Sequence, residues 1–492
     1  MGKTRYFGTD GIRGKVGNHP LVPDFVLRLG YASGKVLGNA TKAHPTFLVG
    51  RDTRQSGQML QSALTAGMLA SGATVIDLGV ITTPGVAFMA RKLNADAGVV
   101  ISASHNPVDE NGIKFFNPGG MKLNEDVELG METLIDGEMV LSQMHSADFG
   151  RSIDGTDMRE LYVDDLVDEQ NGLKLDQLSL VLDCANGAAS WYAPEVFSRL
   201  GATIVAINAS PTGTNINNMA GSEHVRSHPG NLAALIRQYG ANFGIVFDGD
   251  ADRVIFVDEN GDLVDGDHML AILADYLHKH DKLLGDTIVS TTMANGALIN
   301  YFDKRNMRFI ETPVGDKYVM EELVRLQALG ENQEQFGLGG EQSGHIILMD
   351  ELHRTGDGIR TALYVIKAFL ESNQASLAAL SASIQKYPQL VASCNVANKP
   401  ELETMEGLTT LLASIREELP GIVRMNARYS GTEPKFRLML EADNRHNIQE
   451  LASRAWAVCE FIQSASQTPK GATVEVLNVT SGGLLAKPSN PC

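Results

Sequence analysis

The sequence predicts an α/β protein made of three similar domains with mixed sheets, followed by a C-terminal α+β domain. Short apolar segments alternate with helical patterns over most of the 492 residues, which is typical of βαβ units. The same order of elements recurs three times, and Ala-Asn-Gly-Ala occurs in both the second and the third unit. The C-terminal part of the chain lacks this repeated order of strands and helices. A chain of this length accommodates roughly three or four domains of ~100–200 residues.

The first unit begins with an apolar strand that ends at a turn containing arginine and aspartate. Strands are expected at residues 46–50, 74–78 and 98–102, and helices around residues 60–68 and 86–93. Because helices of this length separate the strands, the sheet is expected to be largely parallel or mixed.

The second and third units repeat this plan. Strands are expected at residues 180–183 and 244–247 in the second unit, and at residues 287–290 and 336–340 in the third. In each unit the later strand runs into a polar loop. The three polar loops therefore occupy equivalent places in three equivalent domains.

The C-terminal domain reads as two helices around an extended segment. The helices are expected near residues 408–419 and 448–463, and the extended segment at residues 422–440. The tail is rich in Gly, Ser, Thr and Pro and is expected to be poorly ordered in places. The predicted divisions are residues 1–155, 156–256, 257–374 and 375–469, with a tail at residues 470–492.

Composition and charge limit the function and the location. The chain has 41 basic and 59 acidic residues, a net charge of −18, which argues against a nucleic-acid or anionic membrane surface. The four cysteines are far apart and have no metal-binding spacing, which fits a reducing cytoplasm. The N-terminus has no apolar signal core, and no apolar run approaches the ~18 residues of a membrane span. A cytoplasmic protein is expected.

The first polar loop, Ser102-Ala103-Ser104-His105-Asn106-Pro107, follows an apolar strand. Open α/β sheets place their chemistry in loops of this kind, so Ser104 is a candidate nucleophile. His105 lies beside it in the sequence, and Lys114 follows within a few residues. By itself, a polar turn that caps a helix would explain these residues better. Considered together with the other loops, however, these residues favour a catalytic serine over a helix-capping turn.

The second polar loop places Asp248, Asp250 and Asp252 at alternate positions. Clustered carboxylates repel one another unless a cation neutralises them, and their hard oxygens suit Mg²⁺ or Ca²⁺. An EF-hand is rejected, because Arg253 occupies the position where that loop needs glycine and the flanks look like strands. A solvated acidic turn is disfavoured because apolar strands enter and leave the loop.

A third feature suggests phosphate binding in the C-terminal domain. Ser430-Gly431-Thr432 is a small-residue turn that offers hydroxyls and free amides, which can form an anion nest. Arg428, Lys435 and Arg437 bracket this turn, and arginine forms bidentate bonds with phosphate. The alternative is an ordinary turn between strands.

Near the N-terminus, a glycine-rich loop carries Arg13, although a simple leader turn would also account for it.

Taken together, the motifs resemble those of the α-D-phosphohexomutases in order and spacing, from about residue 4 to about residue 465. They are Phe7-Gly8-Thr9-Asp10-Gly11-Ile12-Arg13-Gly14, the loops at residues 102–107 and 248–253, Gly340-Glu341-Gln342-Ser343-Gly344-His345, and residues 428–437. The resemblance implies four domains around one central cleft. It is strongest to the branch that acts on glucosamine phosphates.

The resemblance also implies roles for the residues that react. Ser104 would carry a phosphate, and Asp248, Asp250 and Asp252 would hold one Mg²⁺ together with that phosphate. The remaining catalytic candidates are His105; Lys114 and His345 as acid–base residues; and Arg13 and Arg253 as supports of the reacting phosphate. Such chemistry needs positioning and charge neutralisation, which Mg²⁺, arginine and lysine supply.

Substrate recognition is assigned to two loops by the same resemblance. Glu341 and Ser343 would hold sugar hydroxyls, and Gln342 is an amide that can contact the sugar or can point into the domain and shape the loop. The clamp for the phosphate that does not react would be Arg428, Ser430, Gly431, Thr432 and Arg437.

The implied reaction interconverts glucosamine 6-phosphate and glucosamine 1-phosphate through a phosphoserine and a bisphosphate, and feeds amino-sugar and cell-wall precursor synthesis. A sugar 1,6-bisphosphate is expected as activator, and the protein as a monomer or homodimer. The alternatives are phosphomannomutase or phosphoglucomutase activity and a non-catalytic phosphosugar-binding protein. Two segments depart from the family pattern: residues 327–336, which are longer and more polar, and the tail beyond Pro469.

Overall fold

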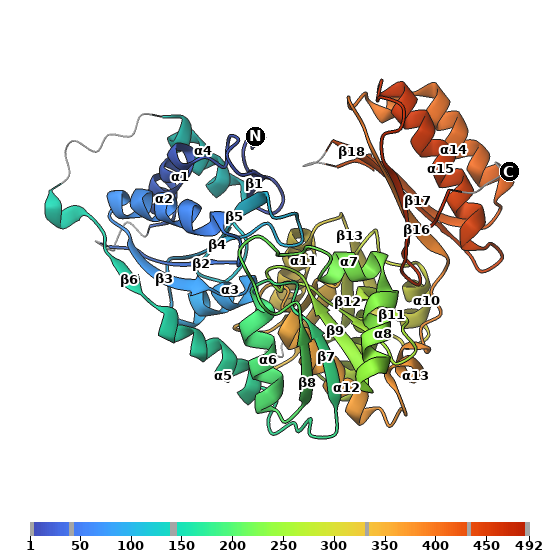
Figure 1. The fold of residues 1–492 in the computed structure, drawn as a ribbon, viewed down its shortest axis with the longest axis horizontal. Helices are drawn as coiled ribbons and strands as arrows, with labels where there is room; N and C mark the ends of the chain where they lie inside the picture. Colours follow the sequence, from blue (N-terminus) through green and yellow to red (C-terminus); the bar gives the residue numbers. More distant parts are fainter. Residues whose placement is uncertain (1–3, 39–43, 138–144, 330–333, 431–433, 488–492) are drawn as a thin grey trace.

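The computed structural model contains four β-sheets, each associated with its own group of helices (Figure 1). The structure describes residues 4–38, 44–137, 145–329, 334–430 and 434–487. We name domains I to IV after the four sheets in chain order. None of the helices in these residues combines the length and the apolar composition that crossing a bilayer requires.

Domain I is built on a six-stranded sheet in the order β1-β5-β4-β2-β3-β6. β4, β2, β3 and β6 are parallel, whereas β5 and β1 are antiparallel to their neighbours. Its strands are β1 (Ile12–Lys15), β2 (Thr46–Arg51), β3 (Thr74–Val80), β4 (Ala97–Ile101), β5 (Glu110–Phe116) and β6 (Ser152–Asp154). Its helices are α1 (Pro23–Leu37), α2 (Ser56–Ser71), α3 (Thr83–Lys92) and α4 (Glu125–Asp136), with a short 3₁₀ turn η1 (Ser146–Asp148).

Domain II has a five-stranded sheet in the order β11-β10-β9-β7-β8. Its strands are β7 (Ser179–Asp183), β8 (Thr203–Ile207), β9 (Phe243–Phe247), β10 (Val254–Val257) and β11 (Leu263–Val264). Its helices are α5 (Glu160–Asp168), which follows the 3₁₀ turn η2 (Thr156–Arg159), α6 (Ala189–Arg199), α7 (Ser222–Ser227) and α8 (Pro229–Tyr239).

Domain III has a four-stranded sheet in the order β13-β12-β14-β15. Its strands are β12 (Leu283–Thr291), β13 (Arg308–Thr312), β14 (Phe336–Gly340) and β15 (Ile346–Met349). Its helices are α9 (Gly266–Lys279), α10 (Ala297–Asp303), α11 (Asp316–Leu329), α12 (Gly358–Glu371) and α13 (Leu377–Ser381).

The three α/β domains share one strand arrangement, which confirms the predicted repeat. In each domain two parallel pairings are followed by an antiparallel one: β3-β2-β4-β5, β8-β7-β9-β10 and β13-β12-β14-β15. Each predicted polar loop joins the last two strands of its set. The loops at residues 102–109, 248–253 and 341–345 are therefore topologically equivalent, and all three follow the carboxyl end of a parallel strand.

Domain IV is an α+β unit, as predicted, with an antiparallel sheet in the order β17-β18-β16-β19. Its strands are β16 (Gln389–Asn395), β17 (Ile422–Tyr429), β18 (Lys435–Ala442) and β19 (Val474–Asn478). Its helices are α14 (Glu406–Glu418) and α15 (Ile448–Ala465), with a 3₁₀ turn η3 (Leu402–Thr404). β19 lies in the tail, so residues 474–478 of the tail form a regular strand. Val474 and Val476 pair with an open edge of β16, which no pattern within the tail could show.

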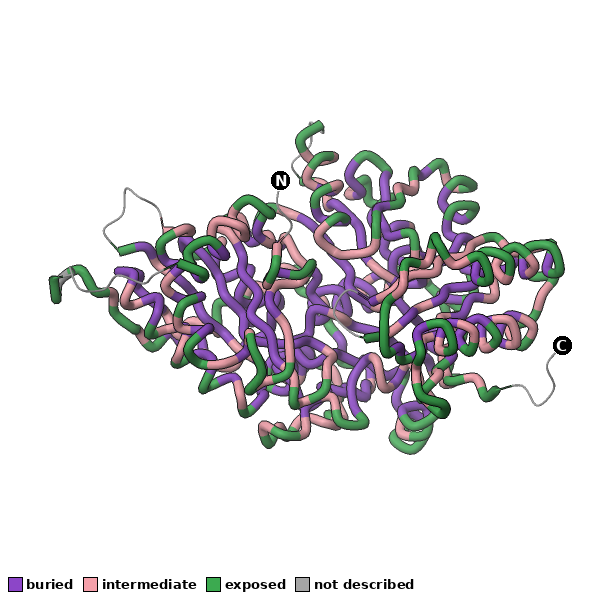
Figure 2. The backbone as a smooth tube through the Cα atoms, turned by 90° about the horizontal axis from the view of Figure 1, so that it is seen from above, coloured by how far each residue is buried: buried purple, intermediate pink, exposed green. Residues whose placement is uncertain are grey.

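Hydrophobic burial joins domains I to III but leaves domain IV separate. One large cluster of buried side chains contains Val86 of α3, Phe197 of α6 and Ile359 of α12, so it spans all three α/β domains. Figure 2 shows this buried backbone running through the middle of the molecule. Domain IV packs its own core between its sheet and its helices, with Leu438 and Val458 among its members. The first three domains thus form one body, on which domain IV stands.

Candidate active site

Ser104 lies in the loop between β4 and β5 and is buried. Its φ of 53° is in the left-handed region, which is uncommon for a residue other than glycine and marks a constrained position. The Ser104 amide donates to Ser102 Oγ at 2.9 Å, which helps to fix the loop. Ser104 Oγ donates to Asp248 Oδ2 at 2.5 Å and lies 3.3 Å from His105 Nδ1. The first and second polar loops therefore meet at this hydroxyl.

A buried arginine that the sequence analysis did not single out holds this loop in shape. Arg54, just after β2, pairs with Asp52 at 2.9 Å, and both side chains have an exposed fraction of 0%. Its guanidinium donates to four carbonyl oxygens of the serine loop, those of Ser104, Asn106, Pro107 and Glu110. Asp52 also accepts from Ser102 Oγ at 2.7 Å. Charge-assisted bonds of this kind are strong, so Arg54 is a structural centre of the site.

The three aspartates of the second loop are buried together against Lys114 of β5. They offer carboxylate oxygens within 4.8 Å of one another. Lys114 Nζ lies 3.0 Å from Asp250 Oδ2 and 3.3 Å from Asp252 Oδ2. Thr83 Oγ1, at the start of α3, donates to Asp250 Oδ2 at 2.6 Å. Lys114 and Thr83 thus offset part of the negative charge from the domain I side.

The aspartates do not share one electrostatic environment. Burial and the charges of Asp252 and Asp250 raise the pKa of Asp248 well above its ordinary value. Burial acts in the same direction at Asp252, but the charges of Lys114, His345 and Arg253 hold the pKa of Asp252 below its ordinary range. The cluster lacks enough positive charge in this arrangement, which favours a cation at the carboxylates.

Two arginines from other parts of the chain, Arg253 and Arg13, place positive charge near His105. Burial and the charges of Arg253 and Arg13 lower the pKa of His105 to about 3, so its imidazole is neutral. Arg253 lies 3.8 Å from Asp252 and 3.6 Å from Glu223 of α7. Arg13, on β1, forms an ion pair with Asp10. These guanidiniums lie close enough to His105, beside Ser104, to act on an anion at the serine.

Asp10 and Asp316 extend the charged site from domain I to domain III. Lys122 bridges them, at 2.5 Å from Asp10 Oδ1 and 2.7 Å from Asp316 Oδ2. Asp316 in turn lies 3.7 Å from His345 Nε2. The Gly356 amide donates to this same nitrogen at 3.0 Å, so the backbone already occupies His345 Nε2 in this structure. Sequence reasoning did not find this relay, because Lys122 and Asp316 lie outside the recognised motifs and Asp10, which lies within the first motif, was given no role.

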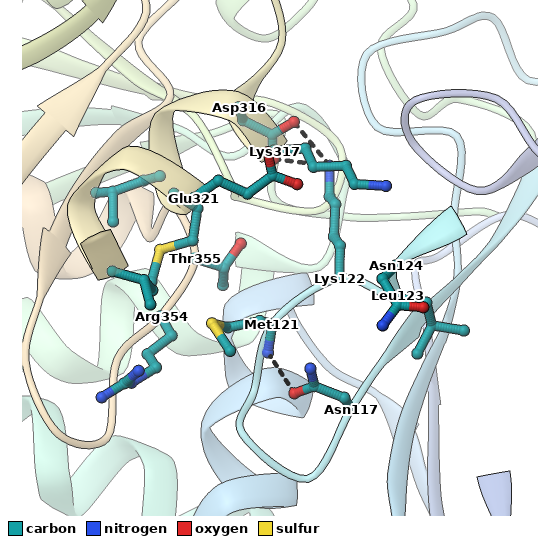
Figure 3. A pocket seen from close by; sticks show the side chains of 13 residues that line it. Asn117, Met121, Lys122, Leu123, Asn124, Asp316, Lys317, Glu321, Arg354 and Thr355 are labelled. Carbon is teal, nitrogen blue, oxygen red and sulfur yellow. Dashed lines mark hydrogen bonds and ion pairs between the residues drawn. The ribbon is translucent and has the colours of Figure 1, made fainter. Parts of the chain in front are cut away.

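A cavity of about 300 Å³ opens between domains I and III beside this relay (Figure 3). Figure 3 shows Lys122 and Asp316 facing each other across the boundary, with dashed lines marking their contact. Met121 and Leu123 line it from domain I, and Arg354 from domain III. The cavity therefore lies at the junction between the two domains, at the Lys122–Asp316 pair.

The predicted sugar-binding loop, residues 341–345, divides its side chains between the site and the protein interior. Burial and the Asp316 carboxylate raise the pKa of Glu341, while Arg253 and His345 oppose that rise, so Glu341 faces the charged site. Gln342 turns away: its amide donates to Asp267 Oδ2 at 2.6 Å and to Gln389 Oε1 at 2.7 Å. The interior orientation of Gln342, one of the two that the sequence allowed, is thus the one observed, and the prediction of Gln342 as a substrate-binding residue is corrected to an anchoring contact.

The predicted phosphate clamp begins at the end of β17 in domain IV, with Arg428 and Ser430. Burial and the neighbouring charge of Arg437 lower the pKa of Arg428, while Glu341 acts in the opposite direction. Arg428 therefore lies within electrostatic reach of the sugar-binding loop. Ser430 is buried, and its amide donates to the Lys435 carbonyl at 2.8 Å. Gly431 and Thr432 lie outside the described residues.

Several buried polar atoms of the described residues converge on this site without a hydrogen-bond partner. Most buried polar groups are paired, so an unpaired set in one place indicates where a ligand binds. The set includes guanidinium donors that can bind an anion, carboxylate oxygens that can bind a cation, and one hydroxyl. Its members are Arg13 Nε, Arg253 Nε, Asp250 Oδ1, Asp252 Oδ1 and Ser343 Oγ.

Comparison with protein families assigns all four domains to one group. The models for phosphoglucomutase/phosphomannomutase α/β/α domains I, II and III match residues 4–140, 160–261 and 265–387, and the model for the C-terminal domain matches residues 392–457. A curated relative, the phosphoglucosamine mutase of Anoxybacillus flavithermus, is 42% identical over 462 residues, which are 93% of this chain and 98% of that one. The chain belongs to the phosphoglucomutase/phosphomannomutase family.

Solved structures agree with this fold. A phosphoglucomutase/phosphomannomutase family protein from Burkholderia thailandensis superposes with a TM-score of 0.71, at 24% identity, covering 96% of this chain and 100% of that one. An N-acetylphosphoglucosamine mutase from Aspergillus fumigatus, solved with GlcNAc-6P and magnesium, superposes with a TM-score of 0.62 at 18% identity, covering 94% of this chain and 96% of that one. At these identities the structures support the fold alone.

Proposed function

We propose that the protein interconverts glucosamine 6-phosphate and glucosamine 1-phosphate through a phosphorylated Ser104. The curated relatives are phosphoglucosamine mutases that match over nearly the whole of both chains. The observation that carries the proposal is the placement of Ser104, whose hydroxyl lies 2.5 Å from Asp248 within a buried cluster of three aspartates. A serine used only to cap a turn has no need of such surroundings.

In the proposed first step, phosphorylated Ser104 gives its phosphoryl group to the free hydroxyl of the sugar monophosphate. The bond from phosphorus to Ser104 Oγ breaks, a bond to the sugar oxygen forms, and the hydroxyl proton passes to a base in the site. The resulting 1,6-bisphosphate turns round. Ser104 Oγ then attacks the other phosphate, and the released sugar oxygen takes up the proton. Each cycle returns the phosphoserine unchanged, and free 1,6-bisphosphate can restore a dephosphorylated serine.

The cationic side chains would stabilise the phosphoryl group in transit. Lys114 of β5, Arg13 of β1 and Arg253 of the aspartate loop come from three different elements, so they can surround negative charge that builds up on the transferring oxygens. Lys114 is also our candidate for proton exchange with the sugar hydroxyl. His345 Nε2 already accepts from the Gly356 amide, so we assign His345 to holding the turn of the sugar loop in this arrangement.

The aspartate loop fits a hard divalent cation such as Mg²⁺. Asp250 and Asp252 each leave a buried carboxylate oxygen without a hydrogen-bond partner among the described residues, and carboxylate oxygens are the ligands that Mg²⁺ prefers. Asp248, Asp250, Asp252 and the Ser104 phosphate would hold the ion. When bound, it would neutralise charge on the phosphoryl group.

Recognition of the sugar would use the loop of domain III and the clamp of domain IV. Ser343 has a buried hydroxyl without a partner, and it can bond a sugar hydroxyl. The Glu341 carboxylate can accept from hydroxyls and can pair with the C2 ammonium that distinguishes glucosamine from glucose and mannose. Arg428 and Ser430, together with the residues that follow, would hold the phosphate that does not react.

The test is a comparison of kcat/KM for glucosamine, glucose and mannose 1-phosphates under identical conditions. We expect glucosamine 1-phosphate to be the best substrate, because only it satisfies Glu341 with a positive charge. A higher kcat/KM for glucose or mannose phosphate would contradict the assigned sugar. No turnover of any of the three would contradict the proposed mutase reaction.

A further inference from the structure

The C-terminal tail forms a hairpin beyond the part of domain IV that the family model matches. β19 pairs with the outer edge of β16, and the chain then turns back. The Asn478 amide donates to the Gly483 carbonyl at 2.9 Å, and the Leu485 amide donates to the Val476 carbonyl at 2.8 Å. We call residues 474–485 the tail hairpin. Two regular hydrogen bonds define its turn, residues 479–482, although its composition resembles that of a flexible linker.

The turn of this hairpin holds the start of β16, where domain IV leaves domain III. The Gln389 amide donates to Thr480 Oγ1 at 2.8 Å, and Thr480 Oγ1 donates to the Tyr387 carbonyl at 3.0 Å. The Val479 amide donates to the Gln389 carbonyl at 3.0 Å, and the Val479 side chain is buried. The connection between the two domains is therefore held by the tail as well as by its own chain.

The same turn also contacts domain II. The Gly483 amide donates to the Arg226 carbonyl at 2.8 Å, at the end of α7. A Cβ atom added to Gly482 would lie 3.0 Å from the Arg226 oxygen and 3.4 Å from Pro229 Cγ, so a side chain there would require the turn or its neighbours in domain II to shift by a few tenths of an ångström. In Figure 1 the red C-terminal strand descends from domain IV towards α7 and β11.

This contact connects to the proposed reaction centre. Arg226 pairs with Glu223 at 3.1 Å, and Glu223 lies 3.6 Å from Arg253, the residue after Asp252. Domain IV has its own core, so its place over the cleft depends on contacts such as this one. The hairpin contacts both the connection and α7, so it lies between domain IV, which carries Arg428, and domain II, which carries the aspartate loop.

We propose that the tail hairpin is a bracket that fixes domain IV against domain II, and that Thr480 and Gly482 are positioning residues for the phosphate clamp. The second half of this proposal rests on the function proposed above. The bracket itself does not, because it concerns the distance between two domains.

The test uses the full chain with Gly482→Leu, which wedges the turn away from α7. Gly471→Leu is the matched control: φ is 80° at Gly482 and 86° at Gly471, so both substitutions carry similar backbone strain, but a Cβ at Gly471 meets nothing within 4 Å. Spin labels at exposed Tyr239 of α8 and Glu417 of α14, in a Cys492→Ser background, report the distance between domains II and IV. KM and kcat are measured in parallel.

We expect Gly482→Leu to broaden the label distance distribution and to raise KM about fivefold with a smaller change in kcat, because the clamp binds a phosphate that does not react. Gly471→Leu should behave like the parent. Thr480→Val replaces the hydroxyl with a methyl group of similar size, and it should change the distance distribution and KM in the same direction but by less. This variant tests the proposal if Gly482→Leu fails to fold.

Three other outcomes are informative. An unchanged distance distribution in Gly482→Leu and Thr480→Val overturns the bracket, whatever the activity. A broadened distribution with unchanged KM overturns the positioning role. A broadened distribution in a protein that turns over no hexose phosphate supports the bracket and instead contradicts the proposed function.

Discussion

At the scale of single residues, Arg54 binds the backbone of the loop that presents the proposed nucleophile. Replacing it with methionine leaves Asp52 buried without its charged partner and removes one donor from each of four loop carbonyls, although Asn217 Nδ2 still donates to those of Ser104 and Asn106 and the Glu110 amide to that of Pro107. Breaking a buried pair in this way costs about 3–5 kcal/mol, so Arg54→Met should lower Tm markedly and reduce kcat as well. Thermal melting and steady-state kinetics measure the two effects.

The matched control for this prediction is Arg51→Met, three positions away. Arg51 is only partly buried and bonds one side-chain oxygen, that of Gln61, at 2.9 Å. Its loss should cost about 1 kcal/mol or less. Equal melting temperatures for the two variants would show that Arg54 is not a centre of the loop.

The sequence could identify the site residues that lie in recognisable loops, but not those that support them. Ser104 and the three aspartates follow apolar strands in a repeated pattern, so their proximity could be inferred. Arg54 binds mainly backbone carbonyls about fifty residues further along the chain, and carbonyls leave no trace in a sequence. For Gln342 the residue type allowed two orientations, and only the buried partners in domains III and IV select between them.

At the scale of elements, Gln342 ties the sugar loop to the start of β16. Gln342→Met removes both amide contacts and leaves Asp267 and Gln389 buried without this donor. Because the side chain does not face the sugar, KM should rise for glucosamine and glucose phosphates alike, and the ratio of their kcat/KM values should stay constant. A fall in kcat/KM for glucosamine phosphate alone would instead show that Gln342 distinguishes the sugars. Ser343→Ala provides the contrast, since the Ser343 hydroxyl is buried without a hydrogen-bond partner in the described part of the chain and is our candidate for a bond to the sugar.

Glu441 of β18 belongs to the same junction and predicts a pH dependence. Burial raises the pKa of Glu441 to about 7, although the Gly296 amide and Arg424 favour its charged form. The folded protein therefore binds a proton there that the unfolded chain releases above its ordinary glutamate pKa. Between about pH 4.5 and pH 7 this group makes stability fall as pH rises, by at most about 1.4 kcal/mol per pH unit.

The measurement compares Tm from pH 5 to pH 7.5 in the parent and in Glu441→Gln. In Glu441→Gln the fall of Tm with rising pH should be less steep, because the amide does not titrate. Glu417→Gln, which removes an exposed carboxyl on α14, should keep the parent's slope. Identical slopes in the parent and Glu441→Gln would rule out this contribution.

Most strands and helices could be predicted at this scale, because apolar spacing alone indicates them in the three repeats. β19 could not. Its Gly-, Ser-, Thr- and Pro-rich surroundings are typical of a mobile tail, and its stability comes from an open edge of β16 that lies some eighty residues earlier in the chain. A strand that depends on a distant edge carries little signal of its own.

At the scale of the whole molecule, the proposed reaction centre lies where domains I and II meet. Ser104 and Lys114 come from domain I, and the three aspartates come from domain II, so a bound divalent ion would also link the two domains. Chelation should abolish turnover, and added Mg²⁺ should restore it and raise Tm, because an ion that binds only the folded protein stabilises it. Asp250→Asn should weaken both responses. Turnover that withstands chelation would contradict the metal assignment.

The arrangement of three equivalent loops around one site could be anticipated from the repeat, since each loop follows the same strand of its domain. The contact of domain IV with domain II could not, because it depends on a turn outside the recognised family pattern. The net charge of −18 likewise does not show where in the fold the arginines and lysines that would bind a phosphosugar come together.

The central claim is that Ser104 exchanges its phosphoryl group with the sugar, and mass spectrometry of a single turnover tests it most directly. Protein whose Ser104 carries an ¹⁸O-labelled phosphoryl group is mixed with unlabelled glucosamine 6-phosphate in slight excess, and the masses of the protein and of the sugar products are followed together. The proposed mechanism predicts that the labelled phosphoryl group leaves the protein and appears in glucosamine 1,6-bisphosphate and then in glucosamine 1-phosphate, while an unlabelled group replaces it on Ser104, and that Ser104→Ala shows neither change. A protein that keeps its labelled phosphoryl group while unlabelled glucosamine 1-phosphate accumulates would contradict the mechanism.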